Sequence, residues 1–136
     1  MTYALLLDLD DTLLHNSMDD FLPRYFGALT ATMAPYVEPE RFLRALHVAT
    51  RAMMKSDDPT HTNEELFWQE FEPLLPMTRA EIEPHLTRFY VEEFPALAGA
   101  TRPMAGGKAL IEAARAAGWR VAIATNPVFP RIAIDH

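Results

Sequence analysis

The sequence predicts an α/β fold in which two parallel strands are separated along the chain by a long helical segment. Two short apolar runs, 4–7 and 121–124, have the length and composition of buried strands. Helical periodicity dominates residues 16–94, and a further helix is predicted over 108–117, just before the second run. Because strands joined through helices in this order pair in parallel, we expect both strands in one sheet.

Composition limits the possible partners and compartment. The 136 residues are 49% hydrophobic and carry a net charge of −7, with no cysteine. The negative charge argues against nucleic acid or an anionic membrane as the main partner, and the lack of cysteine excludes disulfides and thiolate zinc sites. There is no signal-peptide pattern and no apolar run near the ~18 residues of a membrane span, so we expect a cytoplasmic protein.

Four helices are predicted within 16–94, each with its own start signal. Ser17 can cap the first, Pro39 suits the first turn of the second, and the pairs Thr62–Glu65 and Thr78–Glu81 have the spacing of capping boxes. The apolar residues expected to face the core are Leu22, Phe26, Leu29 and Met33; Phe42, Leu46, Ala49 and Met53; Phe67, Phe71 and Leu74; and Ile82, Leu86 and Phe89.

The remaining segments complete the strand–helix–strand arrangement. A loop is predicted over 99–107, Gly118 ends the helix before the second strand, and residues 130–136 read as the start of another helix.

Polar residues follow both predicted strands. Asp8, Asp10 and Asp11 come after the first strand, and Thr125 and Asn126 after the second. The carboxyl ends of parallel strands meet at one edge of the sheet, which is where open α/β sheets bind ligands. These residues therefore form the predicted site.

The aspartates admit a structural and a functional interpretation. Most aspartates after strands form turns or cap helices, and Asp11 fits that role. Asp8 and Asp10 place like charges close together, which is costly without a cation, and Mg²⁺ prefers such oxygen ligands. A calcium-binding loop is excluded because Leu13 stands where that loop needs glycine and Asp19 where it prefers glutamate.

Two motifs resemble those of a known superfamily. LLLDLDDTLL, at 5–14, resembles the first motif, hhhhDxDxT, of the haloacid dehalogenase (HAD) superfamily, and VAIATN, at 121–126, resembles its second motif. The segment 16–94 resembles the helical cap inserted after the first motif in many members. The resemblance implies a partial HAD-like Rossmannoid core, formed by 1–15 and 95–136, with an all-helical cap insertion.

The resemblance also implies roles for the site residues. Asp8 would be the nucleophile that forms an aspartyl-phosphate, and Asp10 the general acid and then base. Mg²⁺ would be held by the Asp8 carboxylate and the Asp10 carbonyl, and phosphate by Thr125 and Asn126, with Thr12 shaping the turn. Members that cleave carbon–halogen bonds lack the second aspartate, so we expect a phosphatase acting on a small phosphorylated metabolite.

The superfamily has two further motifs downstream of the second: a lysine or arginine, and a pair of acids. Arg131 and Asp135 follow too soon to match them, and Lys55 and Lys108 fit solvated surface positions. We therefore expect this chain to hold only the amino-terminal half of such an enzyme. The histidines at 15, 47, 61, 85 and 136 lack metal-ligand spacing and are expected at the surface or in the core, with His15 the nearest to the site.

A second function of a different class follows from the small sheet. Two parallel strands leave apolar edges and faces uncovered. The alternative is thus a short non-catalytic protein, derived from the HAD superfamily, that acts as a homodimer or binds a complementing chain.

Overall fold

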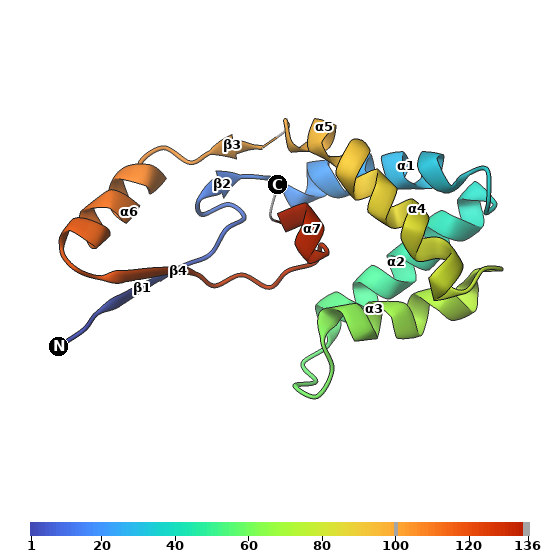
Figure 1. The fold of residues 1–136 in the computed structure, drawn as a ribbon, viewed down its shortest axis with the longest axis horizontal. Helices are drawn as coiled ribbons and strands as arrows, with labels where there is room; N and C mark the ends of the chain where they lie inside the picture. The colour runs from blue at the N-terminus through green and yellow to red at the C-terminus, as the bar shows by residue number, and fades with distance from the viewer. Residues whose placement is uncertain (100, 135–136) are drawn as a thin grey trace. The chain divides into compact units, whose positions relative to one another are not determined.

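The structure, a computed structural model, describes residues 1–99 and 101–134 of the chain (Figure 1). Asp135 and His136, mentioned above, lie outside the described residues.

The elements follow the predicted order, with several short additions. Along the chain they are β1 (Ala4–Leu7), β2 (Leu14–His15), α1 (Met18–Met33), α2 (Pro39–Lys55), α3 (Asn63–Phe71), the 3-10 helix η1 (Glu72–Leu74), α4 (Arg79–Glu92), α5 (Phe94–Ala98), β3 (Arg102–Pro103), α6 (Gly107–Ala116), β4 (Arg120–Ile123) and α7 (Arg131–Ile134). The α/β class and the strand–helices–strand order are as the sequence predicts.

Two compact units divide the chain. One, here called the α/β unit, consists of Met1–Phe21 and Ala98–Asn126. The other, the helical unit, consists of Leu22–Leu97 together with the described residues from Pro127 onward. Each unit is described by itself below.

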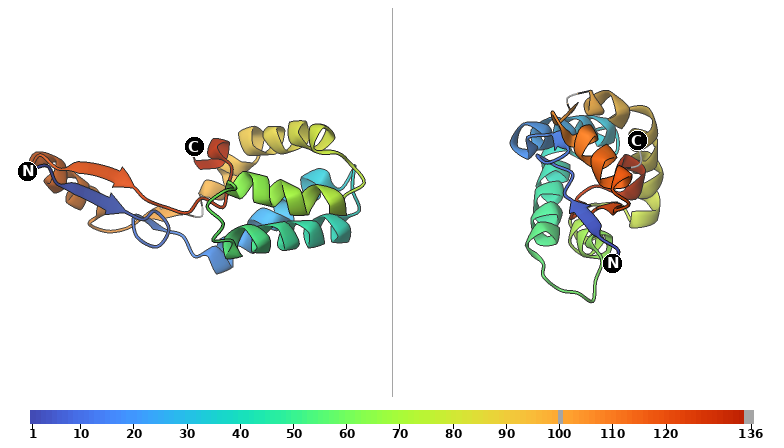
Figure 2. Two further views of the ribbon diagram at one scale, coloured as in Figure 1. Left: turned by 90° about the horizontal axis from the view of Figure 1, so that it is seen from below. Right: turned by 90° about the vertical axis from the view of Figure 1, so that its left-hand side faces the viewer.

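The α/β unit is built on the parallel pairing of β1 with β4. Ala4 lies opposite Arg120 and Leu7 opposite Ile123, and the two strands run side by side in the same direction (Figure 2). The pairing extends one step further, because the Ala124 N–H donates to the Leu7 carbonyl at 2.7 Å. The second strand begins and ends one residue earlier than predicted.

Burial of these strands differs from the expectation. Leu7 is 9% exposed, but Leu6 is 65% and Ile123 57% exposed, so the prediction of strands buried on both faces is wrong. The physical reason is the size of the sheet. A two-stranded sheet has no neighbouring strands, and among the described elements α6 is the helix that packs on β4.

The helical unit owes its packing to the predicted apolar stripes. Phe42, Phe71, Phe89, Leu29, Met33, Leu46 and Ile82 are the largest fully buried side chains. Of the predicted stripe residues, Leu22 and Phe67 are only half-buried, and Leu74, in the turn of η1, is exposed.

Helix starts in this unit follow the predicted chemistry. The Thr62 N–H donates to Glu65 Oε2 at 2.7 Å, and the Thr78 N–H donates to Glu81 Oε2 at 2.8 Å, so both capping boxes are confirmed. Hydrogen bonding to these threonines lowers the pKa of both glutamates. Pro39 occupies the first turn of α2, as predicted, and Glu38 caps that helix.

Short α5 is an addition that the sequence did not predict. The predicted change from cap to core, between residues 94 and 95, falls inside this helix, because proline is compatible with the first turn of a helix, where its missing N–H has no partner to lose. No described helix is both long enough and apolar enough to cross a membrane.

Candidate active site

The sheet brings the two predicted motifs to one edge. β1 and β4 are parallel and in register, so Asp8 and Ala124 leave the sheet together, and Thr125 follows by one residue. Asp8 is exposed, Thr125 half-buried and Asn126 exposed. The expected gathering of polar residues at the carboxyl ends of the strands is therefore present in the α/β unit.

The chain turns tightly after Asp8. The Leu9 carbonyl accepts from the backbone N–H groups of Leu13 and Leu14, both at 2.9 Å. Asp11 adopts a left-handed backbone conformation with φ of 54°, which aspartate tolerates better than most residues. This places Asp11 in the turn, in keeping with its predicted structural role. The Asp8 carboxylate accepts from the Leu9 N–H at 2.8 Å, so the turn also orients this side chain.

Asp10 has a partner that the sequence did not suggest. Its Oδ1 accepts a hydrogen bond from the side-chain amide of Asn16 at 2.9 Å. Asn16 is 8% exposed and is the one buried polar residue among those described. A buried amide that donates to a half-buried carboxylate fixes the carboxylate's direction at little cost, since both groups are satisfied.

A short antiparallel strand pair, formed by segments far apart in the sequence, fixes the rest of the turn. β2 pairs antiparallel with β3, with Leu14 opposite Pro103 and His15 opposite Arg102. The Met104 N–H also donates to the Leu13 carbonyl at 2.8 Å. The predicted loop 99–107 thus contains strand β3. Periodicity could not detect this strand because it is only two residues long.

Gly107, the first residue of α6, lies close to Leu13, just before strand β2. A Cβ at this position would come within 3.3 Å of the Leu13 side chain, which is tighter than ordinary contact. The helix before β4 therefore packs directly against the loop that carries Asp10.

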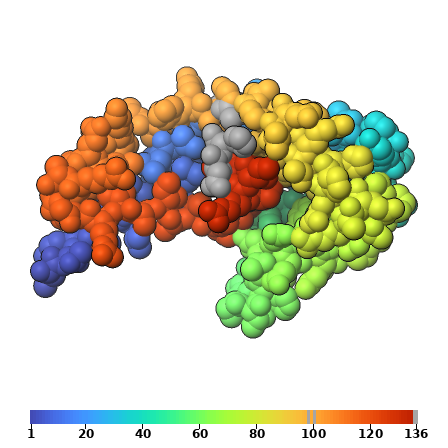
Figure 3. Space-filling model, in the orientation of Figure 1, coloured from blue at the N-terminus to red at the C-terminus, as the bar shows by residue number. Residues whose placement is uncertain are grey.

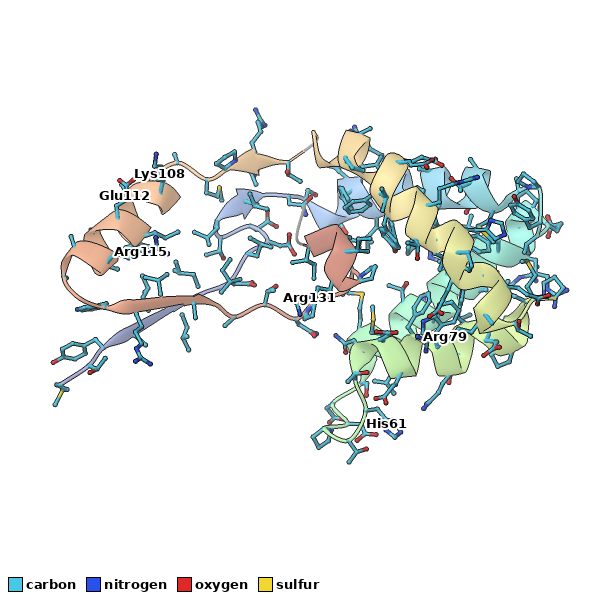
Figure 4. The ribbon with its side chains drawn as sticks, viewed as in Figure 1. His61, Arg79, Lys108, Glu112, Arg115 and Arg131 are labelled. Atoms are coloured by element: carbon cyan, nitrogen blue, oxygen red, sulfur yellow. The ribbon has the colours of Figure 1, made fainter. Side chains whose placement is uncertain are left out.

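Lys108, at the start of α6, is paired within its own helix. Lys108 is paired with Glu112 at 3.8 Å, and both side chains are largely exposed on the helix (Figure 4). This agrees with the surface position expected for Lys108. Arg131 lies on α7, in the helical unit, and Lys55 at the end of α2.

The donor set suits a hard cation but is small. The Asp8 carboxylate and the Asp10 backbone carbonyl, the ligands that the resemblance implies, both offer oxygen atoms, and Mg²⁺ commonly uses one or two protein carboxylates and completes its shell with water and substrate phosphate. Within residues 1–99 and 101–134, no three side chains of the types His, Cys, Asp and Glu gather closely enough to hold a metal ion. The predicted Mg²⁺ ligands are thus chemically suitable, with few protein groups to support them.

Comparison with models of known protein families gives a match to haloacid dehalogenase-like hydrolases over residues 5–133. The match runs through both motifs and the helical segment between them. A search of curated proteins found no match.

Proposed function

Since this chain belongs to the haloacid dehalogenase-like hydrolase family, we propose that it is a Mg²⁺-dependent phosphatase acting on a small phosphorylated metabolite. The observation that carries the proposal is the placement of Asp8. It stands exposed where β1 ends, beside the end of β4, with Asp10 two residues later and oriented by Asn16.

In the first step an Asp8 carboxylate oxygen attacks the phosphorus. A bond forms between that oxygen and phosphorus, while the bond from phosphorus to the leaving oxygen breaks. Asp10 gives its proton to the leaving oxygen, so the leaving group departs as a neutral alcohol. The product on the protein is an aspartyl-phosphate at Asp8.

In the second step water releases the phosphate. Asp10, now ionised, takes a proton from water as the water oxygen attacks phosphorus, and the bond to Asp8 breaks. Asp8 returns as a carboxylate and Asp10 as a carboxylic acid, and inorganic phosphate leaves. The Asn16 amide keeps the Asp10 carboxylate in one orientation through both steps. Bound Mg²⁺, held by Asp8 and the Asp10 carbonyl, would offset the negative charge of Asp8 and the phosphoryl group.

Thr125 and Asn126 are proposed to bind the phosphoryl oxygens. The Thr125 hydroxyl and the backbone next to Asn126 lie where the second strand ends, at the edge that also carries Asp8. Such hydrogen bonds to phosphate oxygens hold the group in line with its attacking and leaving oxygens, which is a large part of catalysis in phosphoryl transfer.

The test is hydrolysis of 4-nitrophenyl phosphate by the full chain, with and without Mg²⁺. We expect activity that depends on Mg²⁺ and is lost in Asp8→Asn. Asp10→Asn should reduce kcat by about 10²- to 10⁴-fold, the usual contribution of a general acid. Asp11→Asn is the matched control, because this exposed turn residue has no chemical role and should leave kcat near that of the unchanged chain. Full activity in Asp8→Asn would sink the nucleophile assignment.

One observation favours the second candidate function, a non-catalytic protein that pairs with another copy or a complementing chain. The apolar side chains of Leu6 and Ile123 are more than half exposed on the small sheet. A chain without phosphatase activity under the conditions above that self-associates would support this alternative.

A further inference from the structure

The helical unit contains a cavity that the proposed chemistry does not use. Its volume is about 420 Å³, within the usual range for small-molecule pockets. It lies among α1, α2, α3, α4 and the segment from Pro127 to Pro130, all within this unit. Asn63 closes one side, since its side-chain amide donates to the Pro127 carbonyl at 2.8 Å.

The wall of this cavity is strongly aromatic. The aromatic rings that line it are Tyr25, Phe26, Phe67, Trp68, Tyr90 and Phe129. Tyr25 and Phe129 meet edge to face, with centroids 5.2 Å apart, and the hydroxyls of Tyr25 and Tyr90 share a hydrogen bond. Burial raises the pKa of Tyr25 to about 12 and also raises the pKa of Tyr90, so both phenols stay neutral at ordinary pH.

The charged residues of the wall have one sign. Glu64 of α3 and Glu83 of α4 line the cavity, and its described lining includes no lysine, arginine or histidine. Both carboxylates pair through their Oε1 atoms with Arg79, which lies over the Trp68 ring at 4.8 Å from its centroid. One guanidinium against two carboxylates leaves a net charge of −1 beside the aromatic wall.

These groups meet where two helices adjoin. Arg79 begins α4, and its side chain reaches Glu64 on α3 (Figure 4). The surfaces of α3 and α4 are continuous in the space-filling view (Figure 3).

The opposite charge lines a second hollow of the same unit. The groove between α1 and α2 is lined by His47, Arg51 and Lys55, and among its lining residues there is no acid. Both hollows are mostly apolar, but the charged residues that line them have opposite signs. The negative charge at the aromatic cavity should therefore favour a cationic ligand there.

We propose that the aromatic cavity of the helical unit binds an organic ammonium ion with an apolar or aromatic body. The rings take the apolar body and face the cation with their negative π-clouds, and the carboxylates of Glu64 and Glu83 supply the negative charge that favours the ammonium group. An anionic ligand is disfavoured there by the two carboxylates. The cavity lining includes none of the residues given a role in the proposed phosphatase chemistry, and the proposal is tested by binding alone, without any turnover.

The experiment is calorimetric titration of the full chain with three probes that share a phenylethyl body: 2-phenylethylammonium, 2-phenylethanol and 3-phenylpropanoate. We expect the ammonium ion to bind about tenfold more tightly than the neutral alcohol, and the carboxylate more weakly than either. Equal affinity for the three probes, or no binding of the ammonium ion, would overturn the proposal.

Variants separate charge selection from loss of fold. Glu64→Gln with Glu83→Gln removes both negative charges and leaves Arg79 unopposed, so the ammonium ion should bind more weakly than the alcohol. Glu92→Gln on the same helix is the matched control, since Glu92 pairs with Arg88 away from the cavity and should leave affinity unchanged. Thr87→Lys adds a cation at an exposed lining position and keeps the Arg79 pairs, so ammonium binding should be lost while helicity by circular dichroism is retained. Unchanged affinity in Thr87→Lys would contradict the assignment.

Discussion

At the scale of single residues, Asn16 is a buried side chain whose amide donates a hydrogen bond to one carboxylate, that of Asp10. Its amide donates to Asp10, and a buried amide without a partner would be costly. Asn16 is therefore a positioning residue: it touches the acid that does the proposed chemistry rather than the substrate.

We predict that Asn16→Ala lowers the free energy of unfolding by about 1–3 kcal/mol and lowers kcat more than it changes KM, because Asp10 loses a charge-assisted hydrogen bond. Asn16→Asp is the isosteric comparison. It removes both donor hydrogens and adds a like charge beside Asp10, so it should be at least as harmful. Urea denaturation and steady-state kinetics measure the two effects. An Asn16→Asp variant with normal kcat would contradict the positioning role.

The sequence could predict that Asp8, Asp10 and Thr125 follow the ends of the two paired strands, because strand ends and residue types are visible in the order of residues. It could not predict Asn16. An asparagine before a helix has the pattern of a turn or a cap, and only the folded path of residues 8–14 returns it to Asp10.

At the scale of elements, the packing of α1 against α4 contains a buried pair of phenols. Tyr25 and Tyr90 join the two helices by a hydroxyl–hydroxyl hydrogen bond, and both rings also contact Phe94. Desolvation by burial is the main cause of the raised pKa of each.

This pair predicts a loss of stability in alkali. The pKa of Tyr25 is about 12 in the folded chain against a reference value of 10.0, so the folded state holds the proton more tightly. Stability that is fully present below pH 10 is then lost as the pH rises towards 12. Denaturation midpoints measured from pH 8 upward should fall steeply for the unchanged chain and less steeply for Tyr25→Phe with Tyr90→Phe. Parallel pH curves for the two proteins would exclude the phenols as the cause.

Element prediction from sequence succeeded where a local rule applied. Helices α3 and α4 begin at their capping boxes, and α2 has proline in its first turn. It failed for β2 and β3, because each is a two-residue strand that depends on a partner strand far away in the sequence and not on its own composition.

At the scale of the whole molecule, the exposed apolar surface of the α/β unit is the main departure from a self-sufficient core. The continuous apolar runs of β1 and β4 are typical of strands buried on both faces, yet here Leu6 and Ile123 are exposed. The apolar composition of these strands is thus typical of a sheet that is covered by other elements more fully than in the described residues. Composition predicts that these strand faces pack against other protein surface, but it cannot identify that surface.

We predict that this surface makes the isolated chain associate. Analytical ultracentrifugation over a range of protein concentrations should show species larger than the 15.4 kDa chain. Leu6→Lys with Ile123→Lys should shift the distribution towards monomer, because charge on a strand face and edge opposes pairing. Val48→Lys, an exposed apolar position on α2, is the control and should change little. A monomer at all concentrations would contradict this prediction.

The parallel pairing of β1 with β4 also determines the order in which the chain can fold. Ala4 pairs with Arg120, so nearly the whole chain must be synthesised before β1 finds its partner. Contacts of such high sequence separation form late and slowly, whereas helices α2 and α3, which pack on each other, are neighbours in sequence. On the ribosome, LLLDLDDTLL would emerge before the helical unit, and its strand edge would stay unpaired while the helices form. Its exposure to chaperones and to aggregation is set by the time needed to reach residue 120.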